Sequence, residues 1–300
     1  MSKKIIVCTT MRDFKGTDND LIQIKFLESL QSQTIQSLEL VMTLFGEKSV
    51  EKNVKGVFPN AVFYEGILGD YRYSLTQVLN NAIDYAETQG YSDYAILWTT
   101  CDVLYESEFI EKSINYLKDK AIVTSHPHKI VVLNDSSYDE SRLSSPSSGF
   151  DMLFFSSEFL QDKKIRQAHN KYVFKDWGVY EHFLISLTEL SDHVKMINIY
   201  EESSIVKVEN DRVLTNEPSE FLINSHKRNQ IVFKEYLNNN HLSVNYFNLF
   251  FCHLKFKMSK DRLKHYLYFY KDMFIYASYL RRRLVSSFVP SVIKNHLRRK

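Results

Sequence analysis

Apolar and polar positions alternate in short blocks along the first 110 residues of the chain. Short apolar runs that end in polar residues or glycine are typical of buried parallel strands. Such runs cover residues 4–10, 38–45, 61–66 and 94–98. Apolar residues three or four positions apart predict one helix after Asp20, which is placed to cap it, and another over residues 74–89. This alternation predicts an α/β fold, a mostly parallel sheet with helices on both faces.

The pattern is less regular after residue 120. Further apolar runs predict strands or core segments at residues 121–126, 129–134, 152–160, 195–200 and 203–208. Residues 134–149 are rich in Ser, Asp and Pro, which predicts a long loop. Residues 176–190 predict a helix behind a polar opening, and the pattern is helical from residue 227 onward.

Length and composition agree with one large domain and an appended segment, since 300 residues with 44% hydrophobic content can bury a core. We predict a domain over residues 1–226, with halves 1–110 and 111–226, and a helical extension over residues 227–300. The chain opens directly into a predicted strand without a charged-then-apolar leader. No apolar run nears the roughly 20 residues of a membrane span, and the three cysteines lie far apart. These features predict a cytoplasmic protein.

The formal net charge of +2 hides a strong asymmetry. Residues 241–300 carry 13 Lys/Arg and 2 Asp/Glu, whereas the other 240 residues carry 25 and 34. Between residues 263 and 288, apolar and aromatic residues recur every three or four positions with basic residues between them. A basic, aromatic-rich amphipathic helix predicts peripheral binding at the inner face of the cytoplasmic membrane. The alternative is a helix packed on the domain with a solvated basic face. A nucleic-acid partner is not expected, because the body is acidic and carries no such motif.

A single acidic residue follows the predicted strand at residues 94–98. The strand ends in Thr99-Thr100-Cys101-Asp102, and a helix signal follows with Ser107 as its N-cap. In open α/β sheets, ligands bind beyond the carboxyl ends of the strands. An acid there can hold a metal bound to phosphates or contact a sugar hydroxyl. The plain alternative is a surface loop that begins a helix.

Three segments follow one another in the first 110 residues: FLESLQSQTIQSLELVMTLFGE (26–47), YRYSLTQVLNNAIDYA (71–86) and YAILWTTCDVLYESEF (94–109). Their sequences, order and spacing resemble the nucleotide-sugar half of GT-A glycosyltransferases. The likeness is greatest to the inverting bacterial enzymes of capsule and O-antigen (surface polysaccharide) biosynthesis. The resemblance implies a GT-A-like, Rossmann-like fold. It also implies transfer of a sugar, with inversion, from a nucleotide-sugar donor to a lipid-linked or membrane-proximal glycan acceptor.

Two motifs depart from the family pattern. The family's acidic motif has two Asp separated by one residue, whereas here it reads Thr100-Cys101-Asp102. Mg²⁺ or Mn²⁺ can still bind through Asp102, the donor diphosphate and waters, because such ions keep few protein ligands. A metal-independent reaction is the alternative. The family's base motif, often Glu-Asp, reads Glu181-His182.

The resemblance also indicates which residues bind the donor. They are Thr9, Thr10, Arg12, Glu47, Asp70, Arg72, Asn81 and Asp102. In the family, the loops after the first two strands hold the base and ribose, and the guanidinium of Arg72 suits a diphosphate. The alternative for each is an ordinary polar loop residue.

The acceptor proton needs a base, which a placed carboxylate can provide. Glu181 overlies the family's base motif, and Asp176 is the second candidate, although it also suits a helix N-cap. Trp177 and His182 are candidates for contacts with the acceptor. Trp177 fits a core position equally well. His182 could instead bind a metal or be a satisfied core histidine, which is the commonest role of a lone histidine.

Two other functions stay open. Nucleotidyltransferases share a similar sheet but usually carry a glycine-rich loop after the first strand that wraps the triphosphate. Here the corresponding loop, TTMRDFKGTD, contains one glycine, Gly16. The reduced acidic motif would also fit a catalytically degenerate, membrane-associated scaffold.

Overall fold

The computed structural model describes most of the chain as far as residue 242. The described residues are 3–16, 18–35, 37–46, 48–67, 73–118, 120–125, 129–134, 137–143, 152–175, 180–199, 205–209 and 220–242. All of them belong to one compact unit, Met1–His253.

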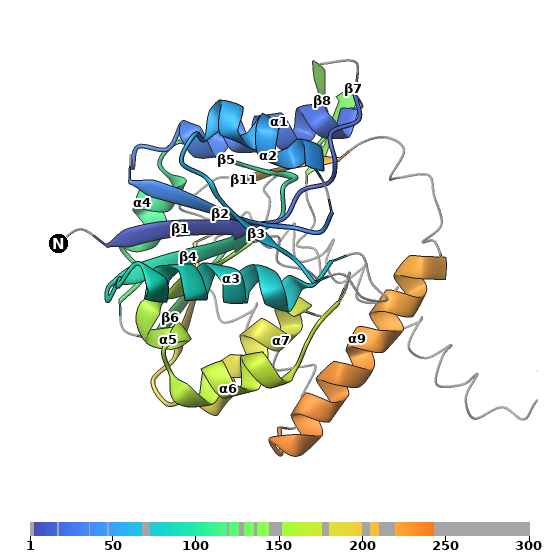
Figure 1. Ribbon diagram of the computed structural model, residues 1–300. Helices are drawn as coiled ribbons and strands as arrows, with labels where there is room; N and C mark the ends of the chain where they lie inside the picture. The colour runs from blue at the N-terminus through green and yellow to red at the C-terminus, as the bar shows by residue number, and fades with distance from the viewer. Residues whose placement is uncertain are drawn as a thin grey trace, which may run out of the picture. The chain divides into compact units, whose positions relative to one another are not determined.

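Seven strands form the main sheet (Figure 1). Across the sheet they are β10 (Lys195–Asn198), β6 (Ala121–Thr124), β9 (Met152–Ser156), β4 (Tyr94–Thr99), β1 (Lys4–Thr9), β2 (Leu38–Leu44) and β3 (Val62–Glu65). Neighbouring strands pair in parallel except at β9, which runs antiparallel to both β4 and β6. The predicted α/β class with a mostly parallel sheet is therefore confirmed.

Helices cover both faces of the main sheet, with α1 and α2 on one face and α3, α5, α6 and α7 on the other (Figure 1). The helices are α1 (Asp18–Gln31), α2 (Lys48–Val57), α3 (Leu75–Thr88), α4 (Phe109–Ile114), α5 (Ser157–Leu160), α6 (Lys163–Lys171), α7 (Tyr180–Ser186), the 3₁₀ turn η1 (Leu187–Leu190) and α9 (Glu220–Asn239). The sequence pattern missed α2 and α6, because most of their residues are polar.

A second, smaller sheet extends from the end of β4. Its strands, in spatial order, are β5 (Val103–Tyr105), β11 (Ile205–Glu209), β7 (Lys129–Asn134) and β8 (Ser137–Leu143). The loop predicted over residues 134–149 is therefore wrong as far as Leu143, because β8 pairs antiparallel with β7. This hairpin pairs polar residues through their backbones, which a composition argument does not detect.

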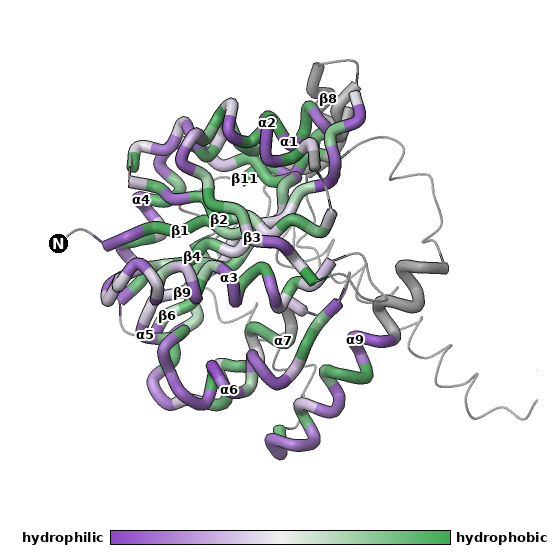
Figure 2. The backbone as a smooth tube through the Cα atoms, in the orientation of Figure 1, coloured by the Kyte–Doolittle hydropathy of each residue, from purple (hydrophilic) through white to green (hydrophobic). Residues whose placement is uncertain are grey.

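Side chains of the central strands alternate between two cores, one on each face of the main sheet. In β4, Ile96 and Trp98 join the core under α3, α6 and α7, whereas Ala95 and Leu97 join the core under α1 and α4. All six residues of β4 are buried. Figure 2 shows the central strands as largely hydrophobic. A strand that is buried on both faces carries a continuous apolar run, and this explains why such runs marked the sheet correctly.

Both predicted helix caps are wrong. Asp20 lies inside α1, and its carboxylate accepts hydrogen bonds from the amides of Lys15 (2.9 Å) and Gly16 (2.5 Å) in the preceding loop. Ser107 lies before Glu108, the residue that precedes α4, and its carbonyl accepts a hydrogen bond from the Thr34 amide at 2.9 Å. The contact of Ser107 comes from a distant segment, whereas those of Asp20 come from the loop directly before its own helix.

Helix α9 crosses the boundary that the sequence predicted between residues 226 and 227. Two of its residues, Phe233 and Tyr236, are buried in the core beside α7, and the Tyr236 hydroxyl donates to the Ser186 carbonyl at 3.1 Å. Residues 243–300 lie outside the described part of the chain, so the basic extension stays a prediction. Among the described residues, no helix is long and apolar enough to cross a bilayer.

Asp162 ties α6 to the segments around it. Its carboxylate accepts hydrogen bonds from Lys120 Nζ and Ser191 Oγ, both at 2.5 Å, and caps α6 through the Lys164 amide at 3.0 Å. Removal from water raises the pKa of this carboxyl group. The hydrogen bonds from Lys120, Ser191 and the α6 amides outweigh that effect and lower the pKa to about 2.

We expect Asp162→Asn to lower the free energy of unfolding by about 1–2 kcal/mol at pH 7. The folded pKa lies below the unfolded value of about 3.9, so the carboxylate stabilises the fold above about pH 4 and loses this effect as the pH falls toward 2. Urea unfolding of wild type and variant should therefore differ at pH 7 and converge near pH 2. Asp192→Asn, at an exposed aspartate, is the control. A difference that stays constant down to pH 2 would contradict this account.

Candidate functional site

The carboxyl ends of β1, β2 and β4 meet at one edge of the main sheet. The parallel register pairs Cys8 with Trp98 and Thr9 with Met42. The buried Thr9 hydroxyl donates to the Thr99 carbonyl at 2.8 Å and so joins the ends of β1 and β4. The loops that follow these strands therefore open at the same place, where ligands of α/β sheets bind.

The turn after β4 is fixed by hydrogen bonds on several sides. The Thr99 hydroxyl bonds the Tyr105 hydroxyl at 2.5 Å, and the Thr100 hydroxyl donates to Asp102 Oδ1 at 2.5 Å. The Asp102 carbonyl accepts a hydrogen bond from the Val208 amide at 2.8 Å. The Asp102 side chain is 36% exposed, so its carboxylate is accessible to a ligand although its backbone is held.

Lys207 brings a positive charge to this turn. Its Nζ lies 3.7 Å from Asp102 Oδ2, and its side chain is 24% exposed. Strand β11 places it, because Lys207 pairs with Val103 of β5. Our sequence analysis missed Lys207. The one signal was a lysine inside the apolar run of residues 205–208, which does not indicate a partner so far away in the chain.

Gln23 of α1 holds the loop after β1. Its side chain, 3% exposed, accepts a hydrogen bond from the Arg12 amide at 2.7 Å and donates to the Arg12 carbonyl at 3.1 Å. The Arg12 side chain is exposed, so its guanidinium can reach a ligand from a fixed backbone. The sequence did not indicate Gln23, because a glutamine within a helix is usually exposed.

Three further amides of this loop also donate to side chains. Ser49 Oγ accepts a hydrogen bond from the Phe14 amide at 2.8 Å. Asp20, as described above, accepts from the Lys15 and Gly16 amides. The loop is therefore stabilised by its own polar neighbours, and a carboxylate stands at the amides that a phosphate would need.

Cys101 lies between the two loops, with its Sγ 3.9 Å from Gln23 Oε1. Desolvation raises the pKa of the Cys101 thiol to about 12, and the neighbouring Asp102 carboxylate contributes to this rise. The thiol therefore stays protonated at neutral pH. A thiol that stays protonated is a poor nucleophile.

Two further contacts bring helices α3 and α7 to this edge. Asn81 of α3 donates through Nδ2 to Thr43 Oγ1 near the end of β2 at 2.9 Å. Tyr180, the first residue of α7, packs edge-on against Trp98 of β4 with ring centroids 5.5 Å apart. The start of α7, which carries Glu181, therefore lies against the carboxyl-terminal half of β4.

Several predicted site residues have no structural test here. Five lie outside the described residues: Glu47, Asp70, Arg72, Asp176 and Trp177. Glu181 and His182 lie in α7, but their side chains are not among those described. Their roles stay predictions. The residues that the structure does bring together at this edge are Thr9, Thr10, Arg12, Asn81 and Asp102.

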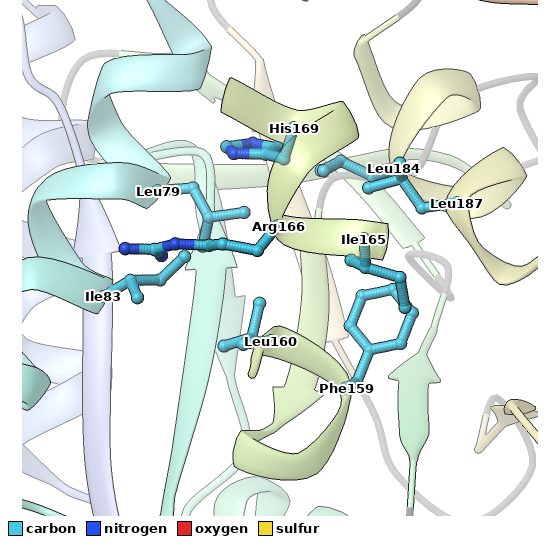
Figure 3. Close-up of a pocket in the computed structure, with 9 residues that line it drawn as sticks. All are labelled: Leu79, Ile83, Phe159, Leu160, Ile165, Arg166, His169, Leu184 and Leu187. Atoms are coloured by element: carbon cyan, nitrogen blue, oxygen red, sulfur yellow. The ribbon is translucent and has the colours of Figure 1, made fainter. Parts of the chain in front are cut away.

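A small cavity lies among α3, α5, α6, α7 and η1, and none of its lining residues belongs to the loops at the sheet edge (Figure 3). Its wall is apolar except for Arg166 and His169. His169 bonds Asn80 Oδ1 at 3.0 Å and the Tyr180 hydroxyl at 2.8 Å. Burial lowers the pKa of His169 to about 3, so it is neutral at physiological pH. The cavity is a gap in the core beside a satisfied histidine.

The described residues do not form a protein-held site for a divalent cation. No group of three or more His, Cys, Asp or Glu among them could hold a metal ion. Asp102 contributes one carboxylate, and the ammonium of Lys207 lies beside it. Magnesium and manganese need several hard oxygen ligands, and a neighbouring cation opposes their binding.

No protein-family model and no curated protein matches the chain. Among solved structures, one described as a nucleotide-diphospho-sugar transferase from Desulfovibrio desulfuricans has 15% identity and a TM-score of 0.43, over 78% of this chain and 97% of its own. A mannosyltransferase from Pyrobaculum calidifontis, in complex with GDP-Man and Mn²⁺, has 14% identity and a TM-score of 0.45, over 69% and 56%. A 4-diphosphocytidyl-2C-methyl-D-erythritol synthase from Anaerococcus prevotii has 14% identity and a TM-score of 0.40, over 76% of this chain and 96% of its own. At these values, function must be argued from the residues of this chain.

Proposed function

We propose that this chain is an inverting glycosyltransferase. It would move a sugar from a nucleotide-sugar donor to a hydroxyl of a lipid-linked or membrane-proximal glycan in the biosynthesis of a surface polysaccharide such as capsule or O-antigen. The observation that carries the proposal is the meeting of two fixed loops at the carboxyl edge of the sheet. One loop presents Arg12 and the other presents Asp102, so charged groups of both signs face the place where a donor would bind.

The proposed reaction has one bond forming and one breaking. The acceptor oxygen bonds to the anomeric carbon, the bond from that carbon to the diphosphate breaks, and the diphosphate takes the electron pair. The acceptor proton passes to a carboxylate, for which we propose Glu181, with Asp176 as the second candidate. Trp177 and His182 would contact the acceptor sugar.

The donor contacts that we propose are those that the family resemblance implies. Thr10, Arg12 and Glu47 would bind the nucleoside, while Asp70, Arg72 and Asn81 would bind the diphosphate side. The buried Thr9 would act through the backbone, since its hydroxyl is used by Thr99.

The loop after β1 argues against nucleotidyl transfer. Such enzymes wrap a triphosphate with the backbone amides of this loop. Here the amides of Arg12, Phe14, Lys15 and Gly16 already donate to side chains, and the carboxylate of Asp20 holds two of them. A triphosphate would have to displace these bonds and approach a negative charge.

A donor screen with UDP-, GDP-, CDP- and TDP-sugars tests the proposed function. We expect hydrolysis or transfer with one nucleotide class, and Asp102→Asn should lower kcat/KM at least about a hundredfold with little change in Tm. Asp93→Asn, at an exposed aspartate before β4, is the control. If the protein turns over none of these donors, the result would favour the catalytically degenerate scaffold. Condensation of a nucleoside triphosphate with a sugar phosphate would favour nucleotidyl transfer.

Glu181→Gln should lower kcat at least about a hundredfold, because a base acts in the transition state, and donor affinity should stay near wild type. Single-turnover kinetics and donor titration measure the two quantities separately. Glu189→Gln, at an exposed residue of η1, is the matched control. If Asp176→Asn removes activity and Glu181→Gln does not, the base is Asp176.

Deletion of residues 261–300 should release the protein from anionic vesicles, because the excess positive charge lies in the last 60 residues and the rest of the chain is net negative. Binding of the intact protein should weaken with salt, since charges are screened over about 10 Å at 0.1 M. Co-sedimentation with anionic and with neutral vesicles measures both effects. Equal binding to the two vesicle types would disprove the electrostatic attachment.

A further inference from the structure

The carboxylate of Asp102 poses an electrostatic problem for the proposed donor site. A nucleoside diphosphate is negatively charged at neutral pH, so a bare carboxylate beside it is repulsive. A positive charge beside this carboxylate offsets the repulsion. The described residues do not fit a protein-held divalent ion, as shown above, because one carboxylate stands there and an ammonium lies 3.7 Å from it.

Lys207 is held where such a positive charge is needed. Backbone pairing of β11 with β5 sets Lys207 opposite Val103, the residue after Asp102. The Val208 amide donates to the Asp102 carbonyl at 2.8 Å, which fixes the same register a second time. The ammonium is therefore delivered to the end of β4 by strand pairing, and a change in the length of the intervening chain does not affect its place.

The pair of Lys207 and Asp102 is suited to receive a phosphate. Both side chains are partly exposed, and the ammonium lies 3.7 Å from Asp102 Oδ2. Asp102 Oδ1 is occupied by the Thr100 hydroxyl, so the carboxylate keeps its orientation when the lysine turns to a ligand. A lysine ammonium is a compact charge that binds phosphate oxygens well.

We propose that Lys207 is a catalytic residue that contacts the diphosphate of the donor and neutralises the charge that develops as this group leaves. Asp102 is a positioning residue that holds the ammonium at the end of β4. This inference rests on the proposed glycosyl transfer. The electron pair of the breaking bond goes to the diphosphate oxygen, the acceptor proton goes to the carboxylate base, and Lys207 keeps its own proton throughout. The chain then needs no divalent cation for the step.

The test compares Lys207→Met and Lys207→Arg with wild type in binding and in turnover. Calorimetry compares the binding of UDP, GDP, CDP and TDP with the binding of the corresponding nucleosides. The difference reports on the diphosphate contact without any reaction. We expect Lys207→Met to weaken diphosphate binding at least about tenfold and leave nucleoside binding unchanged, and to lower kcat about a hundredfold or more. Lys207→Arg should recover part of both losses, because it restores the charge.

Two controls make the result specific. Lys112→Met removes another ion-paired lysine, whose Nζ lies 2.9 Å from a Glu106 carboxylate oxygen. This variant should leave binding and turnover unchanged. Thermal unfolding shows whether each variant is folded. The double variant Lys207→Met with Asp102→Asn should lose little more than Lys207→Met alone, because Asp102 acts through the lysine.

Excess chelator separates this inference from the proposed function. Unchanged turnover in chelator supports Lys207 as the cation. Loss of turnover that Mn²⁺ restores would overturn the inference and leave glycosyl transfer standing. If Lys207→Met binds the nucleoside diphosphates as tightly as the wild type does, the inference is overturned and the proposed function still stands. Failure of the folded wild type to bind any of the four nucleoside diphosphates would overturn both.

Discussion

The parallel pairing of β4 with β1 is the constraint on which the rest of this structure depends. Both strands are buried on two faces, so their side chains divide between two cores, with Trp98 on one side and Leu97 on the other. A shift of one residue in register would exchange these sets and disrupt both cores. The same register aligns the ends of the strands, and the bond from Thr9 to Thr99 fixes that alignment where the candidate site begins.

Rigidity at this edge comes from side chains that hold backbone groups. Gln23 binds the Arg12 peptide, Thr100 binds the Asp102 carboxylate, and Tyr105 binds Thr99. Groups fixed in this way need little rearrangement when charge develops in a bound substrate, which is the main requirement for electrostatic stabilisation. The small second sheet contributes to this arrangement, because β5 continues from the β4 turn and β11 pairs with it.

Aromatic packing holds helix α7 against the main sheet. Phe183 of α7 lies 4.6 Å from Phe174 and 4.9 Å from Tyr236 of α9 between ring centroids, and Tyr180 packs on Trp98. These contacts fix α7, and therefore the chain position of Glu181, against the sheet. They also include Phe233 and Tyr236 of α9 in the core, although both residues lie beyond the boundary that the sequence predicted.

The sequence by itself determined the central strands and the helix over residues 75–88, because burial on two faces and a helical apolar stripe leave periodic patterns. It also marked Asp102 as a residue at the end of a buried strand. The tertiary structure alone decided which distant groups surround that residue. Lys207 and Gln23 reach the turn through strand pairing and helix packing, and such contacts depend on three-dimensional register, which local residue patterns do not encode. The role of Ser107 changed for the same reason: this residue suits a helix cap locally, but its carbonyl accepts a hydrogen bond from Thr34 in a separate segment of the fold.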